Sequence, residues 1–188
     1  DIEKYIKDWV IIGGLTGSGK TDFLRSFKES IDLEQIANHR GSAFGVRDSG
    51  QPTQSNFENI LTLDYLNHKY EKLILEDESR TIGRAGLPGF WYQKMQSSKL
   101  VILEVDDDKR AENIYYEYVY DEINNGTSED NLLEKYLGSL NNIKRRLGNV
   151  VYDNIKDLMK SAFHQNEKEI HKEWILTLLT SYYDKMYS

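Results

Sequence analysis

The sequence predicts an α/β domain with a parallel sheet and flanking helices over residues 1–105, followed by an all-helical subdomain over residues 106–188. Short apolar runs alternate with helical patterns in the first part, which is typical of right-handed βαβ units. A glycine-rich loop joins the first apolar run to the first helical pattern. After Asp106, helical periodicity continues without another strand-like run.

The first part contains the strands and helices that such a domain needs. Strands are predicted at Trp9–Ile12, Ile31–Leu33, Lys72–Glu76 and Lys99–Val105. Helices are predicted at Lys20–Ser30, Phe57–Leu66 and Phe90–Gln96. The polar stretches Asn38–Gln54 and Thr81–Gly89 are predicted to be loops. Since long loops in compact domains are often functional, the longer of the two is a candidate binding segment.

The second part shows four apolar stripes with helical spacing and a break with good capping residues at residues 124–128. The stripes consist of Ala111, Ile114, Tyr115, Tyr118 and Val119; of Leu133, Tyr136, Leu137, Leu140 and Leu147; of Val151, Ile155, Leu158, Met159 and Phe163; and of Ile170, Trp174, Leu178, Tyr182 and Met186. These helices are expected to pack on the α/β core as a subdomain.

Composition limits the classes of function. The net charge of −7 speaks against a protein that coats nucleic acid without specificity. The absence of cysteine excludes disulfides and thiolate chemistry and fits a reducing compartment. No apolar run approaches the roughly 20 residues that span a bilayer, and the charged start shows no signal peptide. We therefore expect a cytoplasmic location and no membrane partner. Because Asp1 stands where an initiator methionine would be, we expect a fragment of a longer chain.

The most specific motif is Gly14-Leu15-Thr16-Gly17-Ser18-Gly19-Lys20-Thr21, which lies between the first strand and the first helix. It matches the P-loop pattern GxxxxGK[ST], so the sheet is predicted to be P-loop NTPase-like. Its glycines allow a tight turn that directs backbone N–H groups inward. Lys20 supplies a cation for a terminal phosphate, and the Thr21 hydroxyl is a natural Mg²⁺ ligand. The predicted phosphate-binding residues here are Gly14, Gly17, Ser18, Gly19, Lys20 and Thr21.

An acidic cluster follows the second clear strand. A P-loop needs an acidic side chain at the end of a neighbouring strand to hold Mg²⁺ or a water molecule. Glu76, Asp77 and Glu78 stand at this position, and they are candidate metal ligands together with Thr21. Alternation along a strand places Glu76 and Glu78 on one side and Asp77 on the other. Which of them approaches Thr21 is left open by the sequence.

Several polar and aromatic side chains lie in the predicted loops beside this edge. Arg80 and Arg84 follow the acidic cluster and are candidate clamps for a second phosphate or a nucleic-acid backbone. Asn38-His39-Arg40-Gly41-Ser42 would bind a phosphate, a ribose or a base, with His39 as an acid or base near neutral pH or as a simple loop cap. Trp91 would line a stacking pocket, although packing in the core is the more ordinary role for such a residue.

These motifs together resemble the tRNA 2-selenouridine synthase family, also described as tRNA 2-thiouridine geranyl- and selenotransferases. The resemblance covers residues 9–105 closely and the helical remainder in general character. It depends on the following segments: Gly13–Thr21, Asp32–Glu34, Ala37–Gly45, Gln54 with Phe57–Asn59, and Glu76–Arg84. The Asn-His-Arg-Gly-Ser and Glu-Asp-Glu-Ser-Arg-x-Ile-Gly-Arg stretches are much more specific than the P-loop.

The resemblance implies a two-step reaction on the wobble 2-thiouridine of tRNA anticodons. Geranyl diphosphate first alkylates the sulfur, and selenophosphate then displaces the geranylthio group. Lys20, Thr21, the loop amides and an arginine would stabilise the departing diphosphate with Mg²⁺. The family also carries a rhodanese-like domain with an essential cysteine, which this chain lacks, so a rhodanese partner in cis or in trans is implied.

Binding of a tRNA anticodon loop by an acidic chain requires a local basic patch. The candidate is Lys144-Arg145-Arg146, whose alternative role is a solvated helix end that favours the local dipole. The other substrate-contact candidates are Asn38, His39, Arg40, Ser42 and Trp91.

Two other functions are compatible with the same motifs. A small nucleoside or nucleotide kinase would use ATP, or GTP, at the P-loop, with residues 107–110 as part of a lid. A non-catalytic module would bind nucleotide only and would dock a rhodanese partner through its helical half.

Overall fold

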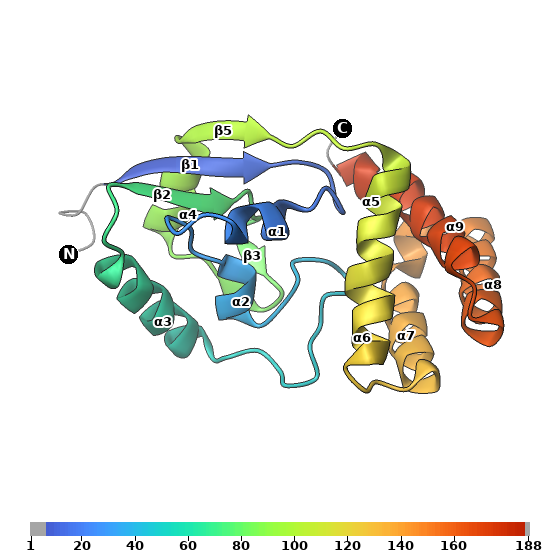
Figure 1. Cartoon of the computed structure of the whole chain (residues 1–188). Coiled ribbons are helices and arrows are strands. Elements are labelled where there is room, and N and C mark those ends of the chain that lie inside the picture. The colour runs from blue at the N-terminus through green and yellow to red at the C-terminus, as the bar shows by residue number, and fades with distance from the viewer. Residues whose placement is uncertain (1–6, 187–188) are drawn as a thin grey trace. The chain divides into compact units, whose positions relative to one another are not determined.

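The computed structural model describes residues 7–186, which form two compact units (Figure 1). One unit consists of residues 7–14 and Lys20–Leu103, and the other consists of Leu15–Gly19 and residues 104–186. The first unit holds a parallel sheet with flanking helices and the second is helical, so the predicted fold class is confirmed. The five residues Leu15–Gly19 thus group with a segment far from them in the sequence.

The sheet has three parallel strands in the order β2-β1-β5. Strand β1 (Asp8–Gly13) lies between β2 (Lys72–Glu76) and β5 (Lys99–Ile102). Strand β5 is shorter than the predicted Lys99–Val105, because its ladder ends where Ile102 pairs with Gly13, the last residue of β1. The carboxyl ends of all three strands therefore meet at the edge where the P-loop begins.

The core of this unit lies on one face of the sheet. Trp9 and Ile11 of β1 and Leu73 and Leu75 of β2 are buried there, since alternate residues of a strand face the same side. They pack against α3 (Gln54–Asn67) and α4 (Gly89–Gln96). Helix α3 begins three residues before the predicted start because Thr53 caps it, its hydroxyl accepting from the Asn56 amide at 3.3 Å.

Helix α1 spans Lys20–Arg25 and is shorter than the predicted Lys20–Ser30. The Ser26 and Phe27 amides bond to carbonyls three residues back, at 3.2 and 3.0 Å, instead of continuing the α-helical ladder. The Ser26 hydroxyl also donates to the Phe23 carbonyl at 2.6 Å. Such side-chain bonds compete with the helix and end it here.

The predicted strand at Ile31–Leu33 is wrong, because this segment opens helix α2 (Leu33–Ala37). The Asp32 carboxylate accepts from the Gln35 amide at 2.8 Å and so caps the helix. Of the strand-like pairing only one isolated bridge remains, between Ser30 and Ile74.

A small hairpin lies within the predicted loop Thr81–Gly89. Its strands are β3 (Thr81–Ile82) and β4 (Ala85–Gly86), which pair antiparallel across a two-residue turn. Gly83 supplies the positive φ of 59° that such a turn demands.

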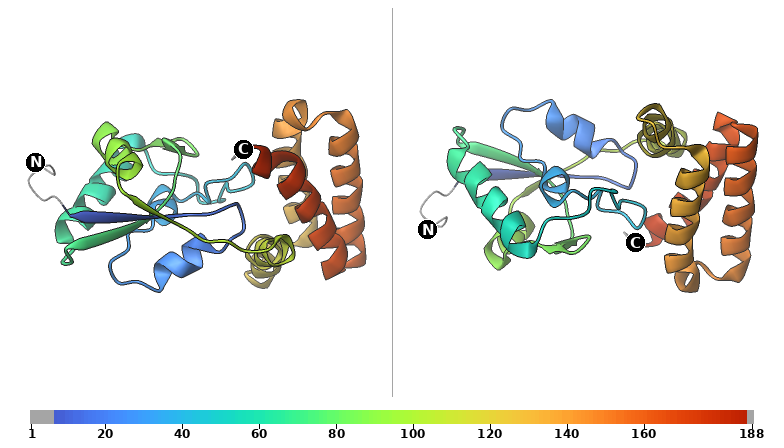
Figure 2. Two further views of the ribbon diagram at one scale, coloured as in Figure 1. Left: turned by 90° about the horizontal axis from the view of Figure 1, so that it is seen from above. Right: turned by 90° about the horizontal axis from the view of Figure 1, so that it is seen from below.

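The second unit is built from α-helices interrupted by irregular turns. Its α-helices are α5 (Asp107–Ile114), α6 (Asp121–Asn124), α7 (Glu129–Leu147), α8 (Asn149–Gln165) and α9 (Lys168–Leu178). The π-helical segments Tyr115–Tyr120 and Leu179–Tyr183 extend α5 and α9, and a 3₁₀ turn, Asp184–Met186, follows the second of them. Helix α8 packs against both α7 and α9 (Figure 2).

The buried stripe of α7 differs from the predicted one by part of a turn. Leu132, not Leu133, is buried, and Ile143 joins Tyr136, Leu140 and Leu147. These positions follow the spacing i, i+4, i+8, i+11, i+15 from Leu132, which keeps them on one helical face. None of the helices described between residues 7 and 186 is both long and apolar enough to cross a membrane.

Candidate functional site

The P-loop has the backbone of a tight anion-binding turn. Gly17 and Gly19 have φ angles of +82° and +76°, a region that side chains disfavour. The Ser18 amide bonds to the Leu15 carbonyl at 3.1 Å. The Ser18 hydroxyl is buried and forms no hydrogen bond with another described residue. A buried hydroxyl of this kind fits a loop that surrounds phosphate oxygens.

Lys20 and Asp77 lie where β1 passes into the P-loop. The Lys20 ammonium donates to the Gly14 carbonyl at 2.9 Å, and the Asp77 amide donates to the Ile12 carbonyl at 2.9 Å. Burial raises the pKa of Asp77, and the positive charge of Lys20 opposes that rise. Thr21 follows in the first turn of α1 and is half-buried. The Asp77 carboxylate lies near the residue before the P-loop, since a Cβ atom on Gly13 would be 3.7 Å from Asp77 Oδ2.

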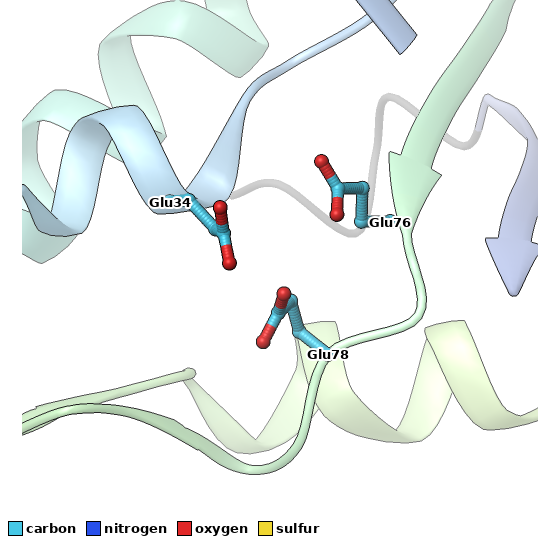
Figure 3. A group of neighbouring side chains, drawn as sticks. All are labelled: Glu34, Glu76 and Glu78. Carbon is cyan, nitrogen blue, oxygen red and sulfur yellow. The ribbon is translucent and has the colours of Figure 1, made fainter. Parts of the chain in front are cut away.

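The other two acids of the cluster face a third carboxylate (Figure 3). Glu34 of α2, Glu76 at the end of β2 and Glu78 place one oxygen each within 4.8 Å of one another. Burial and the neighbouring charge of Glu76 raise the pKa of Glu78 to about 7. Carboxylate oxygens are the ligands that Mg²⁺ prefers, so the donor set fits this ion. The predicted metal role of Thr21, Glu76, Asp77 and Glu78 stays a prediction.

Sequence reasoning gave Glu34 no role. It follows directly after the predicted strand Ile31–Leu33, and its position in helix α2 is what places its side chain near Glu76 and Glu78. In the sequence, Glu34 was singled out only as part of the Asp32–Glu34 segment that resembles the family.

The loop after α2 closes over this carboxylate triad. Gly41 has a φ of +64°, and a Cβ atom there would lie 2.5 Å from Glu34 Oε1 and 3.3 Å from Glu78 Oε1. His39 is buried, and its Nδ1 accepts from the Gly41 amide at 3.1 Å. Burial, assisted by the charge of Arg47, lowers the pKa of His39, so the ring is neutral at pH 7. His39 therefore helps to set the conformation of the loop beside the carboxylates.

Two further polar side chains of this loop hold its backbone. The Asn38 amide group donates to Ser49 Oγ and to the Gly50 carbonyl, each at 2.6 Å. The Ser42 hydroxyl accepts from the Phe44 amide at 3.2 Å. Arg40 is half-buried. The predicted contacts of Asn38, His39, Arg40 and Ser42 with substrate stay predictions.

Two glutamines, to which sequence reasoning gave no role, connect the loop to the hairpin. The Gln51 amide group donates to the carbonyls of Ala37 and Ile82 at 3.1 and 2.9 Å, and its oxygen accepts from the Arg84 amide at 2.8 Å. Gln54 bonds to both the N–H and the C=O of Gly86, at 2.8 and 2.7 Å. Each side-chain amide thus bonds to backbone groups of the hairpin, as a neighbouring strand would. A glutamine in this role leaves no pattern in a single sequence.

The hairpin carries the two predicted arginines. Both side chains are exposed, while the Arg80 carbonyl accepts from the Leu87 amide at 2.9 Å and anchors the backbone. The turn residue Gly83 lies against His39, since a Cβ atom there would be 2.7 Å from the histidine Cδ2. Arg84 therefore stands on a turn adjacent to the Asn38–Ser42 loop, and its role as a clamp stays a prediction.

Trp91 is a core residue, which is the more ordinary of the two roles predicted for it and corrects its place among the substrate-contact candidates. Its side chain is 1 % exposed. Its ring packs 4.8 Å from that of Trp9 and 5.4 Å from that of Tyr65, between centroids. A base has no access to a ring enclosed in this way.

The basic run lies in the last turn of α7, in the helical unit. The Lys144 ammonium stands 4.3 Å from the centroid of the Tyr152 ring, and Arg146 Nη1 donates to the Tyr182 hydroxyl at 3.4 Å. Arg145 is exposed. Two of the three cations therefore pack on tyrosines within their own unit, and the predicted tRNA contact of this run stays a prediction.

Comparison with known proteins matches nearly the whole chain to one family. The family model described as the tRNA 2-selenouridine synthase AAA domain matches residues 7–188. A tRNA 2-selenouridine synthase of Shewanella sp. (strain ANA-3) is 47 % identical in an alignment over 191 residues that covers 94 % of this chain and 52 % of the relative. That of Pseudomonas syringae pv. syringae (strain B728a) is 40 % identical in an alignment over 193 residues that covers 95 % of this chain and 53 % of the relative.

The chain spans about half the length of the curated relatives that it matches. No solved structure matches it.

Proposed function

This chain belongs to the tRNA 2-selenouridine synthase AAA family, and on that premise we propose that it binds a prenyl diphosphate for modification of tRNA. The substrates are geranyl diphosphate, the wobble 2-thiouridine of tRNA and selenophosphate. A rhodanese domain, in the same or in a separate polypeptide, completes the enzyme.

The observation that carries this proposal is an apolar surface beside the phosphate-binding end of β1. Leu100 and Ile102 of β5 are 52 % and 53 % exposed. A Cβ atom on Gly13 would lie 3.0 Å from Leu100 Cδ1 and 2.8 Å from Ile102 Cδ1. Gly13 is adjacent to Gly14, whose carbonyl receives the Lys20 ammonium. An isoprenoid chain next to a diphosphate needs such a pairing of apolar surface with a cation.

The chemistry at such a site is a displacement at an allylic carbon. The thiouridine sulfur forms a bond to C1 of the geranyl group while the C1–O bond breaks and diphosphate leaves, and the N3 proton of the base passes to the diphosphate or to water. Lys20 and the loop amides stabilise the charge that develops on the diphosphate, and Arg84 or Arg80 adds a further cation. In the second step the selenium of selenophosphate forms a bond to C2 of the base while the C2–S bond breaks and geranylthiol leaves, and water then cleaves the Se–P bond and releases phosphate. The task of the protein is mostly to position the reactants.

The donor set for Mg²⁺ is formed by oxygen ligands. Thr21 and Asp77 stand at the P-loop, and the carboxylate triad of Glu34, Glu76 and Glu78 stands beside the Gly41 loop. Bound Mg²⁺ would neutralise diphosphate charge and make it a better leaving group.

The test of this function compares ligands on the native chain and on Lys20→Ala. We expect calorimetry and thermal shift to detect the binding of Mg²⁺–geranyl diphosphate, because a ligand at 100 times its dissociation constant stabilises the folded chain by about 2.7 kcal/mol. Lys20→Ala should lose most of this stabilisation. Binding of Mg²⁺–ATP alone would refute the prenyl-transfer function and favour a kinase.

A second prediction concerns the apolar surface itself. Ile102→Asn should weaken the binding of geranyl diphosphate about tenfold and leave the binding of inorganic diphosphate unchanged. The tenfold effect corresponds to the loss of about 50 Å² of apolar contact at about 25 cal/mol/Å². Leu63→Asn is the matched control, because Leu63 is equally exposed, at 58 %, but lies on α3. Equal weakening of both ligands by Ile102→Asn would contradict the assignment.

A further inference from the structure

Helix α5 of the helical unit holds two successive carbonyl groups of the P-loop. Arg110 Nε donates to the Thr16 carbonyl at 2.9 Å, and Asn113 Nδ2 donates to the Gly17 carbonyl at 3.0 Å. Arg110 and Asn113 are three residues apart and therefore lie on the same face of α5. Loop and helix belong to the same compact unit, so these bonds are part of its internal structure.

Fixing a carbonyl also fixes the amide of the next residue. The peptide plane is rigid and trans, so the N–H of residue i+1 points away from the C=O of residue i. With the Thr16 carbonyl held toward α5, the N–H group of Gly17 is directed to the opposite side, as in the amides that a P-loop offers to phosphate oxygens. With the Gly17 carbonyl held in the same way, the N–H group of Ser18 is directed into the loop, where it donates to the Leu15 carbonyl at 3.1 Å and closes the turn.

Arg110 is itself immobilised. Its side chain is 1 % exposed, and its guanidinium bonds to both carboxylate oxygens of Asp184, at 3.1 and 2.5 Å, and to Asp107 at 2.7 Å. A planar guanidinium paired in this bidentate way has one orientation, which leaves Nε aimed at Thr16. Asp184 stands 74 residues from Arg110 in the sequence.

The close approach of α5 also constrains the loop residue that faces it. A Cβ atom on Gly17 would lie 2.8 Å from the Arg110 carbonyl oxygen and 2.8 Å from Ile114 Cδ1. The loop therefore packs directly on the backbone of α5 at this point.

We infer that Arg110 and Asn113 are positioning residues for the phosphate loop, and that Asp184 holds Arg110 in place for this purpose. The helical unit thereby orders the amides that receive a diphosphate, and this role rests on the phosphate binding proposed above. The ion pair between Arg110 and Asp184 also explains why Arg110 is buried, whereas a lid formed by residues 107–110 would expose it.

The test uses the full chain with Asn113→Ala, Asn113→Asp and Arg110→Lys, and inorganic diphosphate with Mg²⁺ as the probe. Asn113→Asp keeps the size of the side chain but removes the donor, so a role in packing alone would survive it. We expect all three variants to bind diphosphate about 3- to 10-fold more weakly, as the loss of a hydrogen bond predicts. Amide hydrogen exchange at Gly17, Ser18 and Gly19 should become faster in each ligand-free variant.

Asp108→Ala is the matched control. Asp108 lies on the same helix, and its carboxylate pairs with the Lys172 ammonium at 2.6 Å. The variant therefore removes an ion pair that does not involve the P-loop. It should bind diphosphate and exchange its loop amides as the native chain does. Native affinity and native exchange in both Asn113 variants would overturn the inference. If the native chain fails to bind diphosphate, the proposed function fails, while the exchange rates still decide the role of α5.

Discussion

Replacement of Trp91 by alanine is expected to destabilise the sheet unit by about 3–5 kcal/mol, the usual cost of removing a large buried aromatic side chain. The ring fills the space between Trp9 and Tyr65 in the core, and its indole is almost fully enclosed. Chemical denaturation followed by tryptophan fluorescence would measure the loss of free energy of unfolding, with Trp174→Phe as the background so that in the Trp91→Ala variant Trp9 alone reports on the sheet unit.

The same experiment separates a core role from a binding role. A tryptophan that stacked on a base would lose affinity on replacement while stability changed by less than about 1 kcal/mol. Tyr92→Ala is a suitable control, because Tyr92 is the neighbouring aromatic residue of α4 but is only half-buried. If Trp91→Ala unfolded at the same denaturant concentration as the native chain, the core assignment would be contradicted.

Acidification from pH 7 to pH 4 is expected to remove about 3 kcal/mol of stability from the helical unit through His171 alone. This ring is buried, accepts a hydrogen bond from Trp174 Nε1 at 3.1 Å and has its pKa lowered to about 4 by burial. The unfolded chain binds the proton near pH 6.5, whereas the folded chain binds it only near pH 4. The stabilisation is therefore complete above pH 6.5 and is lost as the pH falls from 6.5 to 4, by about 1.4 kcal/mol per pH unit.

The measurement is the free energy of unfolding as a function of pH in the native chain and in His171→Gln. The variant has no imidazole, so its stability should fall less between pH 6.5 and pH 4, even if it starts from a lower value. His164→Gln provides the control, because His164 is an exposed histidine of the same unit. Parallel pH curves for the native chain and His171→Gln would show that His171 is not protonated on unfolding.

The sequence predicted the parts of the fold that depend on local pattern. The strands β1 and β2 follow from apolar runs of buried residues, and α7 to α9 follow from apolar spacing that tertiary packing respects. The segment at Ile31–Leu33 was missed because a short apolar run suits a strand or a buried helix equally. The capping bond of Asp32 decides for the helix, and Asp32 with Gln35 three residues later is a helix-start pattern that the sequence does contain.

The candidate site was predictable to the extent that its residues share a motif. Lys20 and the loop glycines follow from the P-loop pattern, and the alternation that separates Asp77 from Glu76 and Glu78 follows from strand geometry. Glu34 and Arg110 are held in place by contacts with residues distant in sequence, and no local spacing predicts such contacts. Gln51 and Gln54 bond to backbone atoms, which carry no sequence signature.

The assignment of Leu15–Gly19 to the helical unit limits how this protein can be divided. A chain cut after Val105 would keep every letter of the GxxxxGK[ST] motif but would lose Arg110 and Asn113, the donors to its carbonyl groups. A helical segment exchanged between two relatives would lose the same contacts, unless the new helix carries side chains that donate to the carbonyl groups of the loop it packs on. The smallest part of the chain that keeps these contacts is the loop together with α5 and Asp184, even though Asp184 lies 167 positions after Gly17 in the sequence.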